Sequence, residues 1–318
     1  MMPVFRDGEP SMDLTFRFAA DTAGVDSAGA AIDLPNVVLG GPAQTSVASG
    51  VTPTPCRDGV TLWRQGELLW GAAVRRVGSG RFEAAARDVY RAILAAAGAQ
   101  HLHRAWNFLP HINGRGDALE NYHAFCLGRG AALDEAFGEA VDRRLPAATG
   151  VGTPGDRLMV VFVAGRARPR HLENPAQTPA YRYPDRYGPR PPSFARGTVV
   201  AGPAGQRLYV SGTGAIRDSE SLHAGDVEAQ CRVVLENVGL VAQAAGLPGL
   251  DETTPGRRSF RVYLRHPSDW PRVESLLRDG LLRPADTVQA VQADICREEL
   301  LMEIEACVDV PPPQDPDQ

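Results

Sequence analysis

Two glutamates near the end of the chain have the spacing of an acid–base pair. Glu303 and Glu305 alternate with Met302, Ile304 and Ala306, which is the pattern of a β-strand with one apolar face. Side chains at i and i+2 share a face of a strand, so both carboxyls point the same way. On a wet face they are ordinary surface groups. In a cleft, burial and the second carboxylate raise the pKa of a glutamate, which becomes a proton donor near neutral pH.

The preceding segments predict the layer that holds this strand. In order, we expect a strand over residues 206–216, a helix capped by Asp226 and running to about Leu240–Ala245, a strand over 257–265, a helix starting near Pro267, and the strand that carries Glu303. Five residues form the apolar stripe of the first helix: Val227, Cys231, Val234, Val238 and Val241. The second helix is expected to bury Trp270, Val273 and Leu277. This alternation predicts an α+β fold with helices on one face of a sheet.

The first half of the chain repeats this arrangement weakly. Residues 66–74 resemble residues 205–213, and the helix that follows each closes on Ala-Ala-Gly. In the first half we expect a helix over 81–97, a strand over 101–108, a further helix near Leu133–Leu145, and an earlier edge strand at Leu14–Phe18. We therefore predict two related α+β halves, residues 1–150 and 151–318.

The segment 166–198 is rich in proline, arginine and tyrosine and is too long for an ordinary connector. A loop of this length is either disordered or functional. Its tyrosines and prolines favour an ordered loop at an active site.

Two stretches of the second half resemble the RidA/YjgF family. Residues 225–238 with 244–246 resemble its helix signature, and residues 302–306 resemble its last strand, whose first glutamate lies in the active-site cleft. The resemblance implies a RidA-like fold. One position departs from the family, because RidA deaminases carry an arginine after a Pro-Ala pair and here Asp286 follows Pro284-Ala285. This departure argues against enamine or imine deamination.

Longer blocks, spread from about residue 55 to 310, resemble the chorismatases. They are residues 104–113, 120–129, 173–177, 181–196, 211–214 and 294–297. The resemblance implies an enzyme that opens the enolpyruvyl ether of chorismate and releases pyruvate without a cofactor. It also implies a monomer of pseudo-threefold shape, because two related halves and extra segments in one chain replace the trimer usual for RidA.

Chorismate carries two carboxylates, for which arginine is suited because its donors bind them bidentately. The chain has no lysine, so every fixed positive side chain is an arginine. Arg129, Arg196 and Arg265 are the candidate substrate-binding residues, with a surface or structural ion pair as the alternative for each. Tyr187 either donates its hydroxyl to a carboxylate or anchors the long loop.

Glu303 is the expected acid, which delivers a proton to the methylene carbon of the enolpyruvyl group. Glu305 either tunes Glu303 or is solvated. The resemblance implies that Gly214 and Cys296 belong to the type that forms 3-hydroxybenzoate and pyruvate. Arg297 points away from Cys296 if that segment is extended. The alternatives are a chorismate hydrolase that gives a dihydroxycyclohexadiene carboxylate, a RidA-like deaminase, and a non-catalytic small-molecule-binding protein.

Composition excludes several classes. A net charge of −5 gives nucleic-acid binding no electrostatic support. No apolar run approaches a membrane span, and the start of the chain does not resemble a signal peptide. Five scattered cysteines favour reduced thiols in the cytoplasm. We expect no metal site, because the short pair His171-Leu-Glu173 arises easily by chance and suits a surface or packing role.

Overall fold

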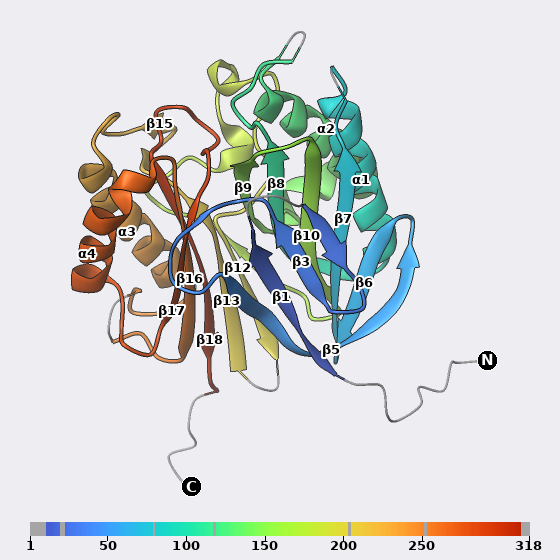
Figure 1. Ribbon diagram of the computed structural model, residues 1–318, viewed down its shortest axis with the longest axis horizontal. Coiled ribbons are helices and arrows are strands. Elements are labelled where there is room, and N and C mark those ends of the chain that lie inside the picture. The colour runs from blue at the N-terminus through green and yellow to red at the C-terminus, as the bar shows by residue number, and fades with distance from the viewer. Residues whose placement is uncertain are drawn as a thin grey trace, which may run out of the picture.

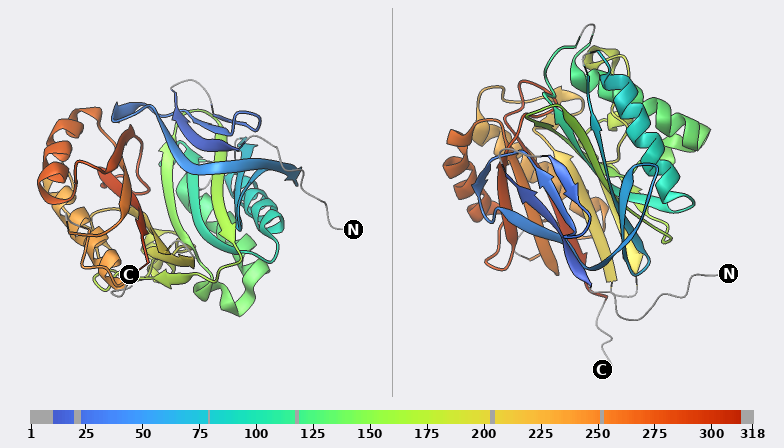
Figure 2. Two further views of the ribbon diagram at one scale, coloured as in Figure 1. Left: turned by 90° about the horizontal axis from the view of Figure 1, so that it is seen from below. Right: turned by 45° about the vertical axis from the view of Figure 1, so that its right-hand side comes forward.

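Two large β-sheets face each other, and the helices cover their outer faces (Figures 1 and 2). The computed structural model describes residues 11–19, 23–78, 80–116, 119–202, 205–250 and 253–312. The expected α+β class is confirmed. None of the helices in these ranges is long and apolar enough to cross a membrane.

The first sheet has nine strands in the order β2-β3-β1-β5-β6-β7-β10-β8-β9. Their bounds are β1 Met12–Phe18, β2 Gly24–Asp26, β3 Ala31–Leu34, β5 Gln44–Arg57, β6 Val60–Gln65, β7 Leu68–Arg76, β8 His101–Pro110, β9 Ala147–Thr153 and β10 Arg157–Gly165. Two helices, α1 Phe82–Ala97 and α2 Asn121–Phe137, lie on its outer face, and a short 3₁₀ helix, η1 Gly138–Arg143, follows them.

The second sheet has seven strands in the order β11-β12-β13-β18-β16-β17-β4. Their bounds are β4 Val38–Gly40, β11 Arg170–Leu172, β12 Gly197–Gly202, β13 Gly205–Thr213, β16 Arg257–Leu264, β17 Thr287–Gln292 and β18 Met302–Val310. The remaining elements are the helices α3 Val227–Ala244 and α4 Trp270–Gly280, the ribbon of β14 Ile216–Arg217 and β15 Glu220–Ser221, and the 3₁₀ helices η2 Ala180–Arg182, η3 Asp185–Tyr187 and η4 Pro267–Asp269.

The weak sequence repeat corresponds to a repeat in strand order. The series β6-β7-β10-β8-β9 in the first sheet matches β12-β13-β18-β16-β17 in the second, and the last two strands of each series pair in parallel. The expected division at residue 150 falls inside β9. β10 pairs with β7 and β8, so the first sheet continues to Gly165.

The second half follows the sequence pattern closely. Asp226 caps α3 by accepting a hydrogen bond from the Ala229 amide at 3.0 Å, and the predicted valine and cysteine stripe is buried. The α4 helix and the strands β13, β16 and β18 also form where expected. α4 buries Val273 and Leu277 as predicted, but Trp270, at its first position, is only half-buried. β18 is buried on both faces, however: Glu303 and Glu305 are both buried, and Glu305 faces the opposite sheet, whose Arg104 and Trp106 donate to it.

Two predictions in the first half were wrong. The helix expected near Leu133–Leu145 is α2, which begins at Asn121 and ends at Phe137. Glycines at helix-interior positions hid it, and one of them has a packing role: a Cβ on Gly128 would lie 2.1 Å from the Glu83 carbonyl oxygen of α1. The strand β1 is not at an edge, since β3 and β5 flank it. These partners come from a region whose sequence has no clear period.

Candidate functional site

A cavity of about 330 Å³ opens between the two sheets at the end of β18 where Glu303 lies. Its walls come from β9, β13, β18 and α2, from the long loop 166–196, and from the bend 294–300. It lies within the size range of small-molecule sites. The long loop contributes Tyr183, Arg186, Tyr187, Pro192, Phe194 and Arg196 to the lining. The loop is ordered and lies at the candidate site, as its composition predicts.

A β-bulge makes room for the Glu303 carboxyl. Between Val210 and Thr213, β13 advances three residues while β18 advances two, from Ala306 to Ile304. At this bulge a Cβ on Gly212 would lie only 1.7 Å from Glu303 Oε1. Glycine at this position is therefore required for the carboxyl to lie where it does.

The Glu303 carboxyl is buried. Its exposed fraction is 5 %, and its Oε1 has no hydrogen-bond partner among the described residues. Burial, and secondly the charge of Glu305, raise its pKa to about 8, against the smaller opposing effects of Arg104 and Arg196. At neutral pH the group therefore holds a proton, which it can donate into the cavity.

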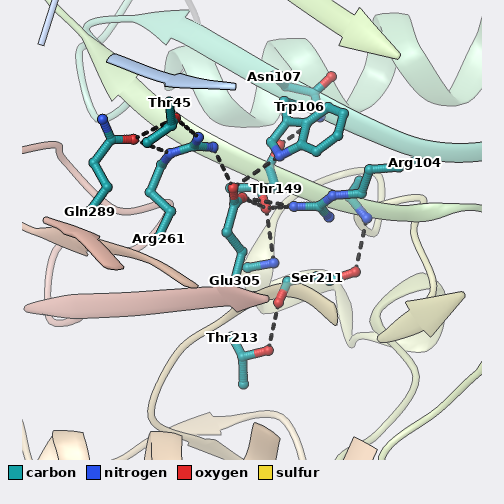
Figure 3. Close-up of polar contacts among 12 residues, drawn as sticks. Thr45, Arg104, Trp106, Asn107, Thr149, Ser211, Thr213, Arg261, Gln289 and Glu305 are labelled. Atoms are coloured by element: carbon teal, nitrogen blue, oxygen red, sulfur yellow. Dashed lines mark hydrogen bonds and ion pairs between the residues drawn. The ribbon is translucent and has the colours of Figure 1, made fainter. Parts of the chain in front are cut away.

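Glu305, two residues on, has the opposite surroundings (Figure 3). Its carboxylate accepts hydrogen bonds from Arg104 at 2.7 Å, Arg261 at 2.7 Å, Trp106 Nε1 at 3.0 Å and Thr149 Oγ1 at 2.6 Å. It is buried at 5 % exposure, which rules out the solvated alternative.

Three arginines of the cavity lining have buried N–H groups without partners in the described part of the chain. They are Arg129 Nε and Nη2, Arg196 Nε, and Arg297 Nη2. The Arg129 guanidinium lies over the rings of Tyr90 and Phe125, which carry no charge to neutralise it. Unpaired guanidinium donors in a small cavity are suited to bind a ligand that carries carboxylates.

Arg265, a predicted substrate-binding residue, is not among the residues that line the cavity. Its guanidinium donates to Asp294 at 2.7 Å and to the carbonyl oxygens of Ile295 and Arg297 at 3.1 and 3.0 Å. Nε also donates to the Leu300 carbonyl at 3.1 Å. Arg265 thus holds the bend 294–300 together, so its contact with the site is indirect.

This bend brings Cys296 and Arg297 to the same cavity. The segment is not extended, so neighbouring side chains are not forced to opposite faces. Arg297 lies 3.7 Å from the ring centroid of Tyr187 and donates to the Ser219 carbonyl at 2.8 Å. The Tyr187 hydroxyl donates to Glu220 Oε2 at 3.0 Å. These contacts favour the anchoring role of Tyr187 over direct binding of a carboxylate.

Cys296 and Gly214 both line the cavity. Burial, followed by the effect of Glu303, raises the pKa of the Cys296 thiol to about 12, so it is not a thiolate near neutral pH. The Tyr122 side chain hydrogen-bonds the thiols of both Cys296 and Cys126, which slightly offsets the rise in the pKa of each. A Cβ on Gly214 would lie 3.1 Å from Leu300 Cδ1, a contact that a small side-chain shift relieves.

The sequence analysis assigned the pair of His171 and Glu173 a surface or packing role. Among the described residues, no group of three or more histidine, cysteine, aspartate or glutamate side chains is placed to hold a metal ion. His171 Nδ1 lies 3.1 Å from Thr198 Oγ1, which fits a packing role.

Among the lining residues that the sequence analysis did not name as site residues are Tyr122, Thr149, Phe194 and Arg297. Tyr122 and Phe194 lie inside the chorismatase-like blocks, which was a usable signal. Thr149 had no signal, because its role depends on the packing of β9 against β13.

Asp286, the residue that replaces the RidA arginine, is ion-paired with Arg258 and Arg283.

Comparisons with known proteins agree with this geometry. A family model described as "Chorismatase FkbO/Hyg5-like, N-terminal" matches residues 47–164. A chorismatase of Streptomyces rapamycinicus is 40 % identical over 279 residues, covering 82 % of this chain and 80 % of the relative. A 3-hydroxybenzoate synthase of Streptomyces hygroscopicus is 37 % identical over 265 residues, covering 79 % and 77 %. The crystal structure of a chorismatase matches with a TM-score of 0.77 at 30 % identity, covering 96 % of this chain and 95 % of that one.

Proposed function

The chain belongs to the chorismatase family, and on that premise we propose that it converts chorismate to 3-hydroxybenzoate and pyruvate. The observation that carries the proposal is the Glu303 carboxyl. It is buried, its pKa is raised to about 8, and Glu303 lines a cavity together with three arginines that have N–H donors without partners among the described residues. A proton donor beside anion-binding groups is what the enol ether of a dicarboxylate needs.

In the proposed reaction, Arg129, Arg196 and Arg297 bind the two carboxylates and orient the enolpyruvyl group. Glu303 protonates its methylene carbon, which forms a methyl group and leaves an oxocarbenium ion. Attack by an oxygen nucleophile, either water or the ring hydroxyl, then allows the carbon–oxygen bond to break and pyruvate to leave. The nearby Arg104 and Arg196 favour the resulting Glu303 carboxylate.

The product depends on what the ring then does. Release of the enolpyruvyl group as pyruvate takes up the elements of one water. The ring loses the elements of one water when it becomes aromatic, so 3-hydroxybenzoate forms without net consumption of water. We propose that Gly214 leaves space beside the ring and that Cys296 acts as a neutral thiol, by shape or by proton relay. Its raised pKa supports this role over covalent attack.

We further propose that the enzyme is a pseudo-threefold monomer in the cytoplasm. The same strand order in both sheets supports the view that one chain carries the related units that RidA supplies from separate subunits. The five cysteines are unpaired, which fits a reducing compartment. Light scattering that gave a stable trimer mass would contradict the monomer.

Incubation of the purified protein with chorismate tests the proposal. Pyruvate is measured with lactate dehydrogenase, and the aromatic product is separated by liquid chromatography. Pyruvate and 3-hydroxybenzoate in equal amounts are expected. Pyruvate with only the dihydroxydiene would overturn the product assignment, and no pyruvate at all would overturn the chorismatase assignment.

A further inference from the structure

Glu305 lies at the centre of a buried network that joins the two sheets (Figure 3). Arg104 and Trp106 reach it from β8, Thr149 from β9 and Arg261 from β16. The side chain of Arg104 is 1 % exposed and that of Arg261 is 9 % exposed. Both halves of the chain therefore supply donors to one carboxylate.

The hydrogen-bond chemistry fixes the charge of Glu305. Two guanidinium groups and an indole N–H have no acceptor atoms to offer in these contacts, so both carboxylate oxygens must accept. The Thr149 hydroxyl accepts from the Gly212 amide at 3.0 Å and also from Arg104, which leaves its single hydrogen for Glu305. Every contact thus requires the ionised form of Glu305.

The charge balance of the network matters for Glu303. Arg104 and Arg261 carry two positive charges, and Glu305 supplies the negative charge that offsets one of them. Glu303 lies on the same face of β18, about 7 Å along the strand. If Glu305 were neutral, both arginines would act on Glu303 through a buried, poorly screened region and favour its ionised form.

We propose that Glu305 is a positioning residue whose fixed negative charge keeps Glu303 protonated, and that Thr149 couples the two glutamates through Gly212. This inference rests on the proposed function, because it assigns Glu305 a role in the acid step. It goes beyond that function in making Arg104, Arg261 and Thr149 part of the control of the proton.

Other charged and titratable groups also face Glu303. Arg196 comes from the long loop, Cys296 from the bend 294–300, Tyr122 from α2 and Tyr263 from the paired position on β16. Arg196 favours the ionised form, and the buried thiol and phenols are neutral near pH 7 because burial raises the pKa of each. Glu305 is the single fixed anion in this set of described groups.

Thr149 provides the mechanical link. Its hydroxyl binds the Gly212 amide that the bulge of β13 frees from the sheet, and Gly212 is the residue against which the Glu303 carboxyl packs. Neighbouring hydroxyls make similar bonds between the sheets, from the Ala148 amide to Ser211 and from the Ala147 amide to Thr198, both at 2.8 Å. The position of Glu303 is therefore set from both halves.

The test compares Glu305→Gln, Arg261→Gln and the double variant Glu305→Gln/Arg261→Gln with the wild type. Glu305→Gln raises the net charge of the network by one, and the double variant restores it. For each protein, the pH dependence of kcat/KM for pyruvate release is measured. Independently of activity, infrared difference spectra follow the protonated carboxyl band that Glu303→Gln lacks.

In Glu305→Gln, we expect activity to be lost at a pH at least one unit lower than in the wild type. For a one-unit change this is a loss of about threefold at pH 7.5 that approaches tenfold near pH 9, with recovery at lower pH. The double variant should return towards the wild type, and Arg261→Gln alone should shift the other way. A merely structural role would not be rescued by a second substitution. If Glu305→Gln does not fold, the double variant against Arg261→Gln alone measures the same charge.

An unchanged pH at which Glu303 loses its proton in Glu305→Gln, or in the double variant against Arg261→Gln, would overturn the inference. So would a loss of activity that is equal at every pH. If the wild type released no pyruvate, the proposed function would fail, but the infrared titration would still decide whether Glu305 holds the proton on Glu303. Thr149→Ser keeps the hydroxyl and should retain activity, whereas Thr149→Val should lower kcat more than it changes KM. The same kcat and KM in both variants would contradict the coupling role of Thr149.

Discussion

The two glutamates of β18 are the same residue type, on the same strand face, with the same 5 % exposure. Glu305 is surrounded by donors from three strands and has two arginine partners. Glu303 has no ion pair among the described residues, and one of its oxygens has no partner. Burial alone therefore does not decide the charge of a carboxyl; the number of donors that accompany it does.

The same contrast separates the two regions around them. Near Glu305, Arg104 and Arg261 each bind the carboxylate, and of these two arginines only Arg104 has a buried nitrogen, Nη1, without a partner among the described residues. Near Glu303, Arg129, Arg196 and Arg297 have unpartnered donors and no carboxylate partner within the described part of the chain, and they line one cavity. A buried donor without a partner is costly, and three arginines with such donors around one cavity are suited to a ligand that carries carboxylates.

The largest effect that separates the two regions is expected from Glu303→Gln. The amide keeps the size of the side chain but has no acid proton to give, so pyruvate release should fall by about a hundredfold to ten-thousandfold. Circular dichroism should show an unchanged fold. Glu67→Gln, an exposed glutamate that does not line the cavity, is the matched control and should stay near the wild type. Near-normal turnover in Glu303→Gln would remove this residue from the mechanism.

Two glycines of β13 and its end sharpen the comparison. In Gly212→Ala the new methyl would occupy the place of the Glu303 carboxyl, and we expect a loss of about tenfold to a hundredfold in kcat from the misplaced acid. Gly214→Ala meets only the flexible side chain of Leu300 and should keep pyruvate release while it changes the product ratio. Steady-state assays with product separation distinguish the two. Equal behaviour of both variants would contradict the placement of Glu303.

Arg297→Gln tests the unpartnered donors. Loss of a charged hydrogen bond to the substrate should raise KM by on the order of tenfold, with a smaller effect on kcat. Arg272→Gln, exposed on α4, is the control and should leave KM unchanged. An unaltered KM in Arg297→Gln would show that its guanidinium serves only to pack against Tyr187.

The smallest expected effect on pyruvate release belongs to Cys296→Ala. The thiol is neutral near pH 7, so its removal should change the fate of the ring more than the opening of the ether. Chromatography should find less 3-hydroxybenzoate and more of the dihydroxydiene, with pyruvate release largely kept. Loss of both products together would instead assign Cys296 to the protonation step.

The sequence predicted the second half of the fold well, because the cap at Asp226 and the valine stripe of α3 are local signals. It predicted the first half less well. Gly128 is unfavourable inside a helix and so concealed α2, yet it is needed there because α1 packs too closely for a larger side chain. The candidate site was predictable for Glu303, because a glutamate on an otherwise apolar strand has few structural functions. The sequence could not show that Arg297 lines the cavity while Arg265 holds the bend 294–300, because that bend is a feature of the tertiary structure. The network of Glu305 combines residues from both halves, and no local pattern reports it.

The measurement that tests the account most directly is the pH dependence of kcat/KM for pyruvate release by the wild type. The folded enzyme raises the pKa of Glu303 from 4.5 to about 8, so the acid is protonated below that pH and ionised above it. The account predicts activity that is high near pH 7 and falls by about tenfold per pH unit above about 8. Activity that instead rises with pH through 8 would show that a deprotonated group performs the step, and would contradict Glu303 as the proton donor.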